Sequence, residues 1–79
     1  MYLHIGKNCV IKNNSIIGIF SIDSIENTKE YKDLLENLDN NMNDISEGQR
    51  KTFILTKEKG FLCGYISNIG INTIKKRKM

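Results

Sequence analysis

The sequence predicts a small α+β domain with a mostly antiparallel β-sheet, one amphipathic helix at about residues 27–39 and a short C-terminal helix. Two runs of β-branched and aromatic residues, 52–56 and 61–67, flank a polar turn that ends in Gly60, which is typical of a β-hairpin. A stripe of apolar residues with helical spacing follows Asn27. We therefore expect one sheet built around the hairpin, with a helix packed against it.

The N-terminal third of the chain predicts three more strands. Residues 2–5 and 9–11 should form two of them, joined by a turn at 6–8. After a turn at 12–15, residues 16–22 are the most apolar strand candidate, and Gly18 within it indicates a bulge or a close backbone approach. His4 in the first strand could titrate or bind a ligand. Because it is the single histidine and no carboxylate precedes Asp23, we expect a packed or rim histidine.

The helix is predicted to begin at a capping box, in which the Asn27 side chain accepts from the amide of Glu30 and Glu30 reaches back. The apolar stripe behind it is spaced i, i+3, i+4 and i+7: Tyr31, Leu34, Leu35 and Leu38. Three acids lie off this stripe: Glu30, Asp33 and Glu36. They could be a metal-binding or catalytic cluster, or a solvated helix face, and we expect the solvated face.

Residues 39–48 have no periodicity and little to bury, so we expect a mobile loop there. The C-terminal helix should run through Ile71 and Ile74, with Asn68 or Asn72 as its cap, and end in the basic run 75–78. That run could serve only to complement the dipole of its own helix. Residues 1–79 are expected to form a single domain with a thin core.

Charge is unevenly distributed along the chain. Residues 1–22 carry a net charge of +2, residues 23–47 carry −6, and residues 48–79 carry +7. This asymmetry indicates one side that faces a polyanion and one solvated acidic side. No run approaches the ~18 apolar residues of a membrane span, and the first residues lack the pattern of a signal peptide. We therefore expect a cytoplasmic protein without membrane contact.

The residues that carry enzyme chemistry are sparse. We find no serine–histidine–acid set, no phosphate-cradling glycine loop and no paired carboxylates on a plausible cleft wall. Cys9 and Cys63 lack the spacing of metal ligands, so we expect reduced, buried thiols. The sequence thus predicts no enzyme activity, cofactor, metal or small-molecule substrate.

Two of the predicted strands, 16–22 and 61–67, are apolar on both faces. Side chains alternate along a strand, so a sheet with one wet face would carry polar residues at every second position. One good helix cannot cover both faces. We therefore expect the second face to pack against another subunit in a homo-oligomer.

Four stretches, at residues 1–6, 17–20, 48–56 and 73–77, resemble the small bacterial RemA/RemB regulators in the same order along the chain, and RemB more nearly. The likeness covers nearly the whole sequence. It implies a small sheet with a helical C-terminal part and a DNA-binding regulator of extracellular-matrix and biofilm genes in low-GC Gram-positive bacteria. It also implies homo-oligomers, including ring-shaped ones, that present arginines to double-stranded DNA.

On this resemblance Arg50 matches one of the family's DNA-facing arginines, while Gln49 and Ser15 stand where two others are expected. Lys51 and Lys12 would replace them in charge, though not in bidentate geometry. The predicted nucleic-acid contacts are Arg50, Lys51, Lys12, Lys75, Lys76 and Arg77. Arg50 and Lys51 could also be ordinary solvated charges at a strand edge. The alternative function is an oligomeric scaffold or interaction module that does not bind DNA.

Overall fold

The structure is a computed structural model and describes residues 1–78. In chain order its elements are β1 (Tyr2–Gly6), β2 (Cys9–Lys12), a 3-10 turn (Asn13–Ser15), β3 (Ile16–Ser21), α1 (Ile22–Ile25), α2 (Lys29–Leu38), a second 3-10 turn (Asp39–Asn41), β4 (Met42–Asp44), β5 (Thr52–Glu58), β6 (Phe61–Ser67) and α3 (Ile71–Lys78). The predicted α+β class is confirmed. No helix within residues 1–78 is both long and apolar enough to cross a membrane.

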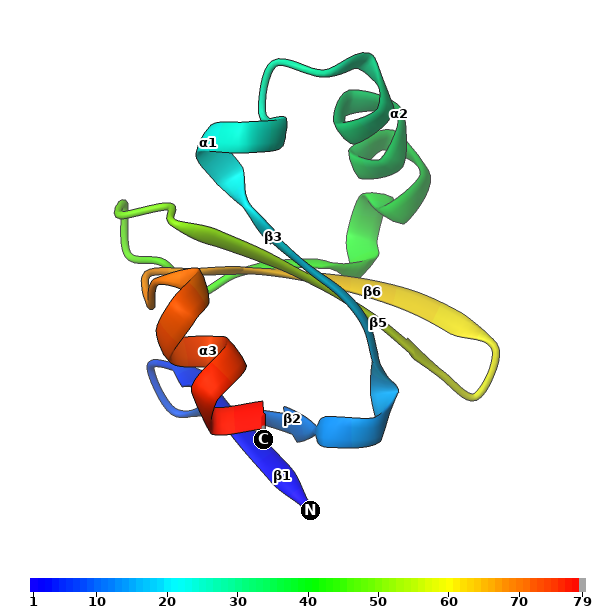
Figure 1. The fold of residues 1–79 in the computed structure, drawn as a ribbon. Coiled ribbons are helices and arrows are strands. Elements are labelled where there is room, and N and C mark those ends of the chain that lie inside the picture. Colours follow the sequence, from blue (N-terminus) through cyan, green and yellow to red (C-terminus); the bar gives the residue numbers. More distant parts are fainter. Residues whose placement is uncertain (79) are drawn as a thin grey trace.

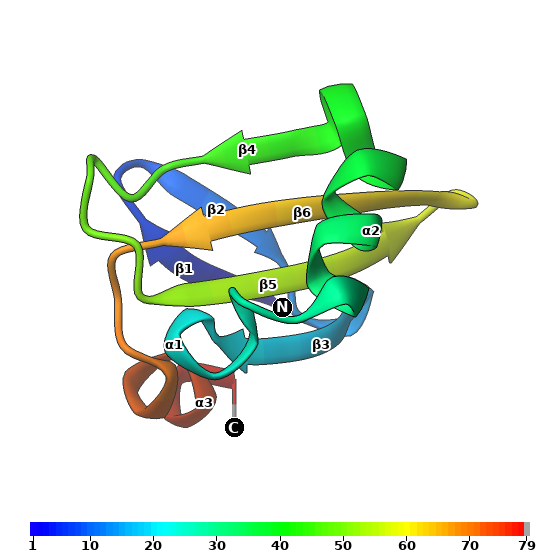
Figure 2. The same ribbon diagram turned by 90° about the horizontal axis from the view of Figure 1, so that it is seen from above.

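The fold has three layers (Figure 1). The central layer is a four-stranded sheet in the order β3-β5-β6-β4, antiparallel except where β4 runs parallel to β6. Helices α1 and α2 cover one face, and Figure 2 shows α2 lying across the strands. The two-stranded sheet β1-β2 and helix α3 cover the other face. Strands β3 and β4 are therefore the two edges of the central sheet.

The core beneath α2 is centred on Phe53, which is fully buried in the middle of the sheet. Tyr31 from α2 meets the Phe53 ring edge-on, with ring centroids 5.3 Å apart, and Phe20 from β3 stacks on Phe53 from the edge of the sheet. Edge-to-face aromatic pairs add about 0.5–1.5 kcal/mol beyond their buried area. Ile22, Leu38 and Ile66 complete the buried cluster. The apolar stripe of α2 packs against this core.

A second core lies on the opposite face of the sheet, beneath the N-terminal hairpin. It is formed by Leu3, Ile5, Ile11, Ile54 and Ile74, one or more from each of β1, β2, β5 and α3. The chain thus covers both apolar faces of its own sheet. The second sheet face therefore does not pack against another subunit as expected, because β1-β2 and α3 supply the cover that one helix could not. Self-association stays a prediction, and any interface must lie elsewhere on the surface.

The central hairpin is confirmed, with a tighter turn than expected. Lys57 and Glu58 belong to β5 and pair with β6, so the turn consists of Lys59 and Gly60 alone. Both have positive φ, 54° and 84°, as a two-residue turn with the twist of a hairpin requires. The N-terminal hairpin is also confirmed, and the register between β3 and β5 shifts between Ile16 and Gly18, as the glycine indicated.

The helix caps were predicted at the wrong residues, one position away for α2 and two for α3. Helix α2 begins after Thr28, whose hydroxyl accepts from the Tyr31 amide at 3.2 Å and donates to the Ile25 carbonyl at 2.7 Å. Asn27 is therefore not the cap of α2. It lies in the short link between the end of α1 and Thr28. Helix α3 begins at Ile71 directly after Gly70, so Asn72 lies inside it and neither predicted asparagine precedes it directly.

Residues 39–48, expected to be a mobile loop with little to bury, contain regular structure. They contain a 3-10 turn and strand β4, whose pairing with β6 joins Met42 to Gly64 and Asp44 to Ile66. Ser46 is fully buried, and its amide and hydroxyl both donate to the Asp44 carboxylate. The stabilising partners lie in β6, outside the segment, so its own composition did not reveal the strand.

Candidate nucleic-acid interface

Arg50 and Lys51 lie in the short connection that leads into β5, and both side chains are exposed. The Lys51 backbone is held at both ends: its amide donates to the Ser67 carbonyl at 3.0 Å, and its carbonyl accepts from the Ile22 amide at 3.0 Å. This fixes the connection against the ends of β6 and α1. Two cations therefore project from a fixed backbone at one end of the sheet.

These two cations line a hollow of about 380 Å³ together with the first turn of α3. Its wall comprises Ser21, Asp23, Arg50, Lys51, Gly70, Ile71, Asn72 and Thr73. Gly70 has no side chain that could cap the first amides of α3. Such amides carry the positive end of the helix dipole and point toward a bound anion. The carboxylate of Asp23 lines the same hollow, and its charge counteracts the positive end of the helix. The hollow thus combines two cations and a helix terminus with one acid.

Two further cations, Lys75 and Lys78, line a second hollow beside the edge strand β3. Its volume is about 430 Å³, and its floor is Ile16–Ile19. Lys75 and Lys78 are three residues apart and so share one side of α3. Bases thus follow the β3 side of α3 from its N-terminus to its last turn. Lys76 is exposed and lines neither hollow.

Arg77 is directed to β1. Its Nη1 donates to the His4 carbonyl at 3.0 Å and lies 3.5 Å from His4 Nδ1. His4 Nε2 lies 2.9 Å from the Lys7 carbonyl, which assigns the proton to Nε2 and leaves Nδ1 as an acceptor. His4 is thus a rim histidine that holds the last turn of α3 on the N-terminal hairpin. Arg77, a predicted DNA contact, thus has a partner within the chain.

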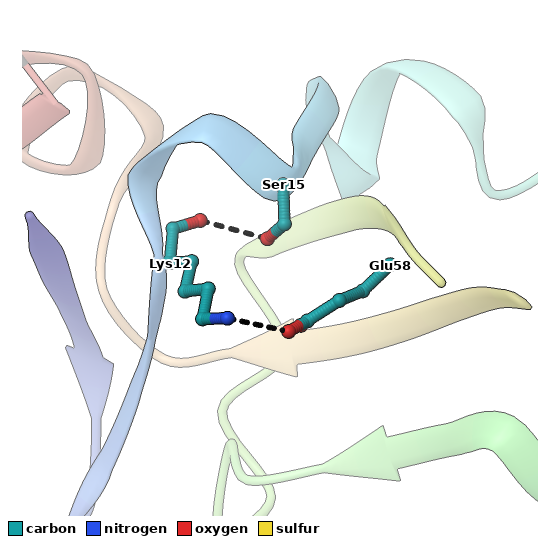
Figure 3. A network of polar contacts seen from close by, with 3 residues as sticks. All are labelled: Lys12, Ser15 and Glu58. Atoms are coloured by element: carbon teal, nitrogen blue, oxygen red, sulfur yellow. Dashed lines mark hydrogen bonds and ion pairs between the residues drawn. The ribbon is translucent and has the colours of Figure 1, made fainter. Parts of the chain in front are cut away.

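Lys12 is also engaged within the chain (Figure 3). Its Nζ lies 3.1 Å from Glu58 Oε1, and the hydrogen bond from Lys12 to this carboxylate, with its charge, raises the pKa of the lysine. Ser15 is buried and donates to the Lys12 carbonyl at 2.7 Å. Lys12 and Arg50 lie beyond opposite ends of β5. From Thr52 to Glu58 the strand advances six residues, about 20 Å at the usual ~3.3 Å per residue.

The six predicted contacts therefore separate into three places. Arg50 and Lys51 line the hollow at the start of α3, and Lys75 and Lys76 lie along α3. Lys12 pairs with Glu58, and Arg77 donates to the His4 carbonyl. The prediction omitted Lys78, Asp23 and the first amides of α3. Lys78 could have been found from its spacing to Lys75 on the predicted helix. Asp23 and the amides could not, because the fold brings them to Arg50 from distant parts of the sequence.

The chain was compared with known proteins in two ways. A scan against protein-family models and a search of curated proteins both found no match.

Proposed function

We propose that the protein is a homo-oligomeric DNA-binding regulator of the RemA/RemB type, acting in the cytoplasm on extracellular-matrix genes. The observation that carries the DNA-binding part is the hollow in which Arg50 and Lys51 face the start of α3. The resemblance of the sequence to RemA/RemB regulators supports the regulatory part. The role is binding, and the proposal includes no catalysis and no small-molecule substrate.

The chemistry of the hollow suits a phosphate of the DNA backbone. Arginine and lysine cations together with amides at a helix terminus are the donors that most often contact DNA phosphates. Their rigid attachment, through the backbone bonds of Lys51, lowers the entropic cost of binding. Phosphate contacts of this kind position a protein on the duplex and respond to DNA shape more than to base sequence.

The lysines along α3 would continue the contact. From Asn72 to Lys78 the helix rises about 9 Å at 1.5 Å per residue. One DNA strand advances about 3.4 Å per nucleotide, so this side of α3 would follow two to three nucleotides. A single subunit offers few contacts, and repetition of the same surface in an oligomer would raise the affinity.

A titration of fluorescent duplex DNA at several salt concentrations tests the proposal. Wild type should bind at low salt, and the slope of log K against log salt should become shallower by roughly 0.9 for each phosphate that a variant no longer binds. The double variant Arg50→Ala/Lys51→Ala should fail to bind. The matched control is Lys29→Ala/Lys32→Ala, which removes the same charge from exposed positions on α2 and should bind like wild type.

The other outcomes are equally defined. Replacement of Lys75 and Lys78 by alanine should weaken binding less than replacement of Arg50 and Lys51, because those lysines lie beside the edge strand, away from the helix terminus that contributes amides to the other hollow. If binding survives the Arg50/Lys51 change, the contact lies on the basic helix instead. If wild type does not bind even at low salt, DNA binding is refuted and the oligomeric scaffold is the remaining function.

A further inference from the structure

The tip of the β5–β6 hairpin projects beyond the rest of the molecule (Figures 1 and 2). Phe61, the first residue after the turn, is 68% exposed, and the neighbouring Leu62 is 37% exposed. The two-residue turn at Lys59 and Gly60 holds both side chains on a regular, paired strand. A large aromatic side chain on a rigid projection is the kind of residue that anchors protein–protein contacts.

The charge around Phe61 is positive. The cross-strand partner of Phe61 is Glu58, which is paired with Lys12 at 3.1 Å. Lys57 and Lys59 lie on either side of Glu58 in the sequence. The carboxylate is therefore compensated within the subunit, and the two lysines set the sign of the tip.

An apolar hollow of about 150 Å³ lies between β3 and the helices α1 and α2. Its lining consists of apolar and aromatic side chains apart from Thr28 and Glu30; the others are Phe20, Ile25, Tyr31, Leu34 and Phe53. Phe20 is 39% exposed at this hollow. A cavity of about 150 Å³ lined by Leu, Ile and Phe accepts a benzene molecule. The hollow thus has the size and lining that a phenyl ring requires.

The surroundings of the hollow are acidic. Glu30 is part of its wall, and Asp33, three residues further along α2, is its neighbour on the helix surface. Glu26 follows directly after α1. Lys29 and Lys32 also lie on α2, so these three acids and two bases leave a net charge of −1 around the hollow, opposite in sign to that of the hairpin tip.

We infer that the phenyl ring of Phe61 from one copy of the chain occupies the hollow between β3 and α2 of a second copy, with the tip lysines against the acids of α2. Phe53 at the hollow and Glu58 beside Phe61 are five residues apart on β5, about 17 Å at ~3.3 Å per residue. One subunit can therefore use its tip and its hollow at the same time. Such a contact is head-to-tail, and it closes into a ring or extends as a filament.

This interface rests on the assembly part of the proposed function and is independent of the DNA part. Size exclusion with light scattering, on the full chain without DNA at micromolar concentration, tests it with two variants. Phe61→Asp destroys the tip, and Leu34→Lys destroys the hollow. Wild type should be larger than a dimer, whereas each variant alone should be a 9.1 kDa monomer. A mixture of the two variants retains one intact tip and one intact hollow, so it should form a heterodimer and nothing larger.

Tyr2→Ser is the control, because Tyr2 is as exposed as Phe61, at 65%, but lies on β1; it should assemble like wild type. Glu30→Lys reverses a charge at the wall of the hollow without removing a buried side chain, so it should weaken assembly even if Leu34→Lys fails to fold.

A monomeric wild type, assembly that survives Phe61→Asp, or folded variants that stay monomeric when mixed would each overturn the interface. Assembly that survives both Leu34→Lys and Glu30→Lys would indicate tip-to-tip contact and overturn it too. Arg50→Ala/Lys51→Ala should assemble normally, so a failure of DNA binding cannot be mistaken for a failure of this interface.

Discussion

The ammonium of Lys12 lies 3.1 Å from the carboxylate of Glu58, joining the end of β2 to the end of β5. The pair connects the N-terminal hairpin to the strand that crosses the centre of the sheet. It also neutralises a lysine that the sequence offered as a DNA contact. Because both side chains are about half exposed, solvent screens the attraction and the pair contributes little to stability.

Lys12→Ala should therefore leave the affinity for duplex DNA within about two-fold of wild type, because the charge it removes is already compensated. Lys51→Ala removes one positive charge as well and should weaken binding clearly. The two single variants are compared in the same fluorescence titration at low salt. An equal decrease in affinity for both would show that Lys12 contacts DNA despite its pairing with Glu58.

Asp23→Asn should tighten DNA binding. The carboxylate lines the same hollow as Arg50 and the start of α3, where it repels a phosphate by on the order of 1 kcal/mol in water. Its removal should lower Kd about five-fold at low salt. Asp39→Asn in the exposed turn after α2 changes the net charge equally and is the control. If both variants tighten binding to the same degree, the effect is one of net charge and the hollow is not the site.

Thr28→Ala should destabilise the domain by about 1 kcal/mol, the usual cost of removing a helix N-cap. Its hydroxyl holds the Tyr31 amide and the Ile25 carbonyl, and so joins α2 to α1. Asn27→Ala should change the free energy of unfolding by less than about 0.5 kcal/mol, as surface substitutions usually do. Urea unfolding followed by circular dichroism measures both. A larger destabilisation at Asn27 than at Thr28 would restore the capping box that the sequence suggested.

Gly64→Ala should destabilise the domain by about 1–3 kcal/mol, as overpacked cores do. A Cβ at this position would lie 2.6 Å from Met42 Sδ, 2.8 Å from Phe53 Cε1 and 2.9 Å from Leu38 Cδ1. The methionine and leucine ends can yield, but the Phe53 ring is held by its neighbours. Gly70→Ala is the matched control, since nothing lies within 4 Å of its Cβ. Thermal unfolding of the two variants should differ clearly, and equal melting temperatures would contradict the packing described for β4, β6 and α2.

The stabilising contribution of the Asp44 carboxylate should be lost in acid. The hydroxyl and amide of Ser46 donate to its carboxylate and lower the pKa of that group. A group whose pKa is lower in the folded chain stabilises the fold above its unfolded pKa, near 4, and the contribution disappears as the pH falls through the folded value. Asp44→Asn should therefore cost stability at pH 7 and make less difference at pH 2. Urea unfolding at both values measures this, and a constant difference would show that charge plays no part.

The parts of the fold that follow from local pattern were predictable. Gly60 after a polar turn located the central hairpin, and the spacing of Tyr31, Leu34 and Leu38 located α2. Strand β4 was not predictable, because its stability comes from backbone pairing with β6 some twenty residues away, and two of its three residues, Asn43 and Asp44, are polar. The cover supplied by β1-β2 and α3 was missed for the same reason: each element is short and gains its place only in the assembled core.

The candidate site could likewise be predicted only where local pattern determines it. Arg50 and Lys51 could be selected from sequence because they follow a glycine and precede a strand. Arg77 was selected from its basic surroundings, but its partner, the His4 carbonyl, is 73 residues away. Composition indicates how many cations a segment has, and the tertiary structure determines which of them remain available to a polyanion.

The parallel pairing of β4 with β6 also sets an order of folding events. Strand β4 precedes its partner in the chain, and both cores are closed by side chains from β5 and β6. When the N-terminal half of the chain leaves the ribosome, α2 and β4 have nothing to pack on, and β1-β2 has no sheet to cover. Contacts between residues distant in sequence form slowly because the loop between them must close first. Folding must therefore wait until the chain has been made at least as far as Ser67, and the cooperative unit is the whole domain.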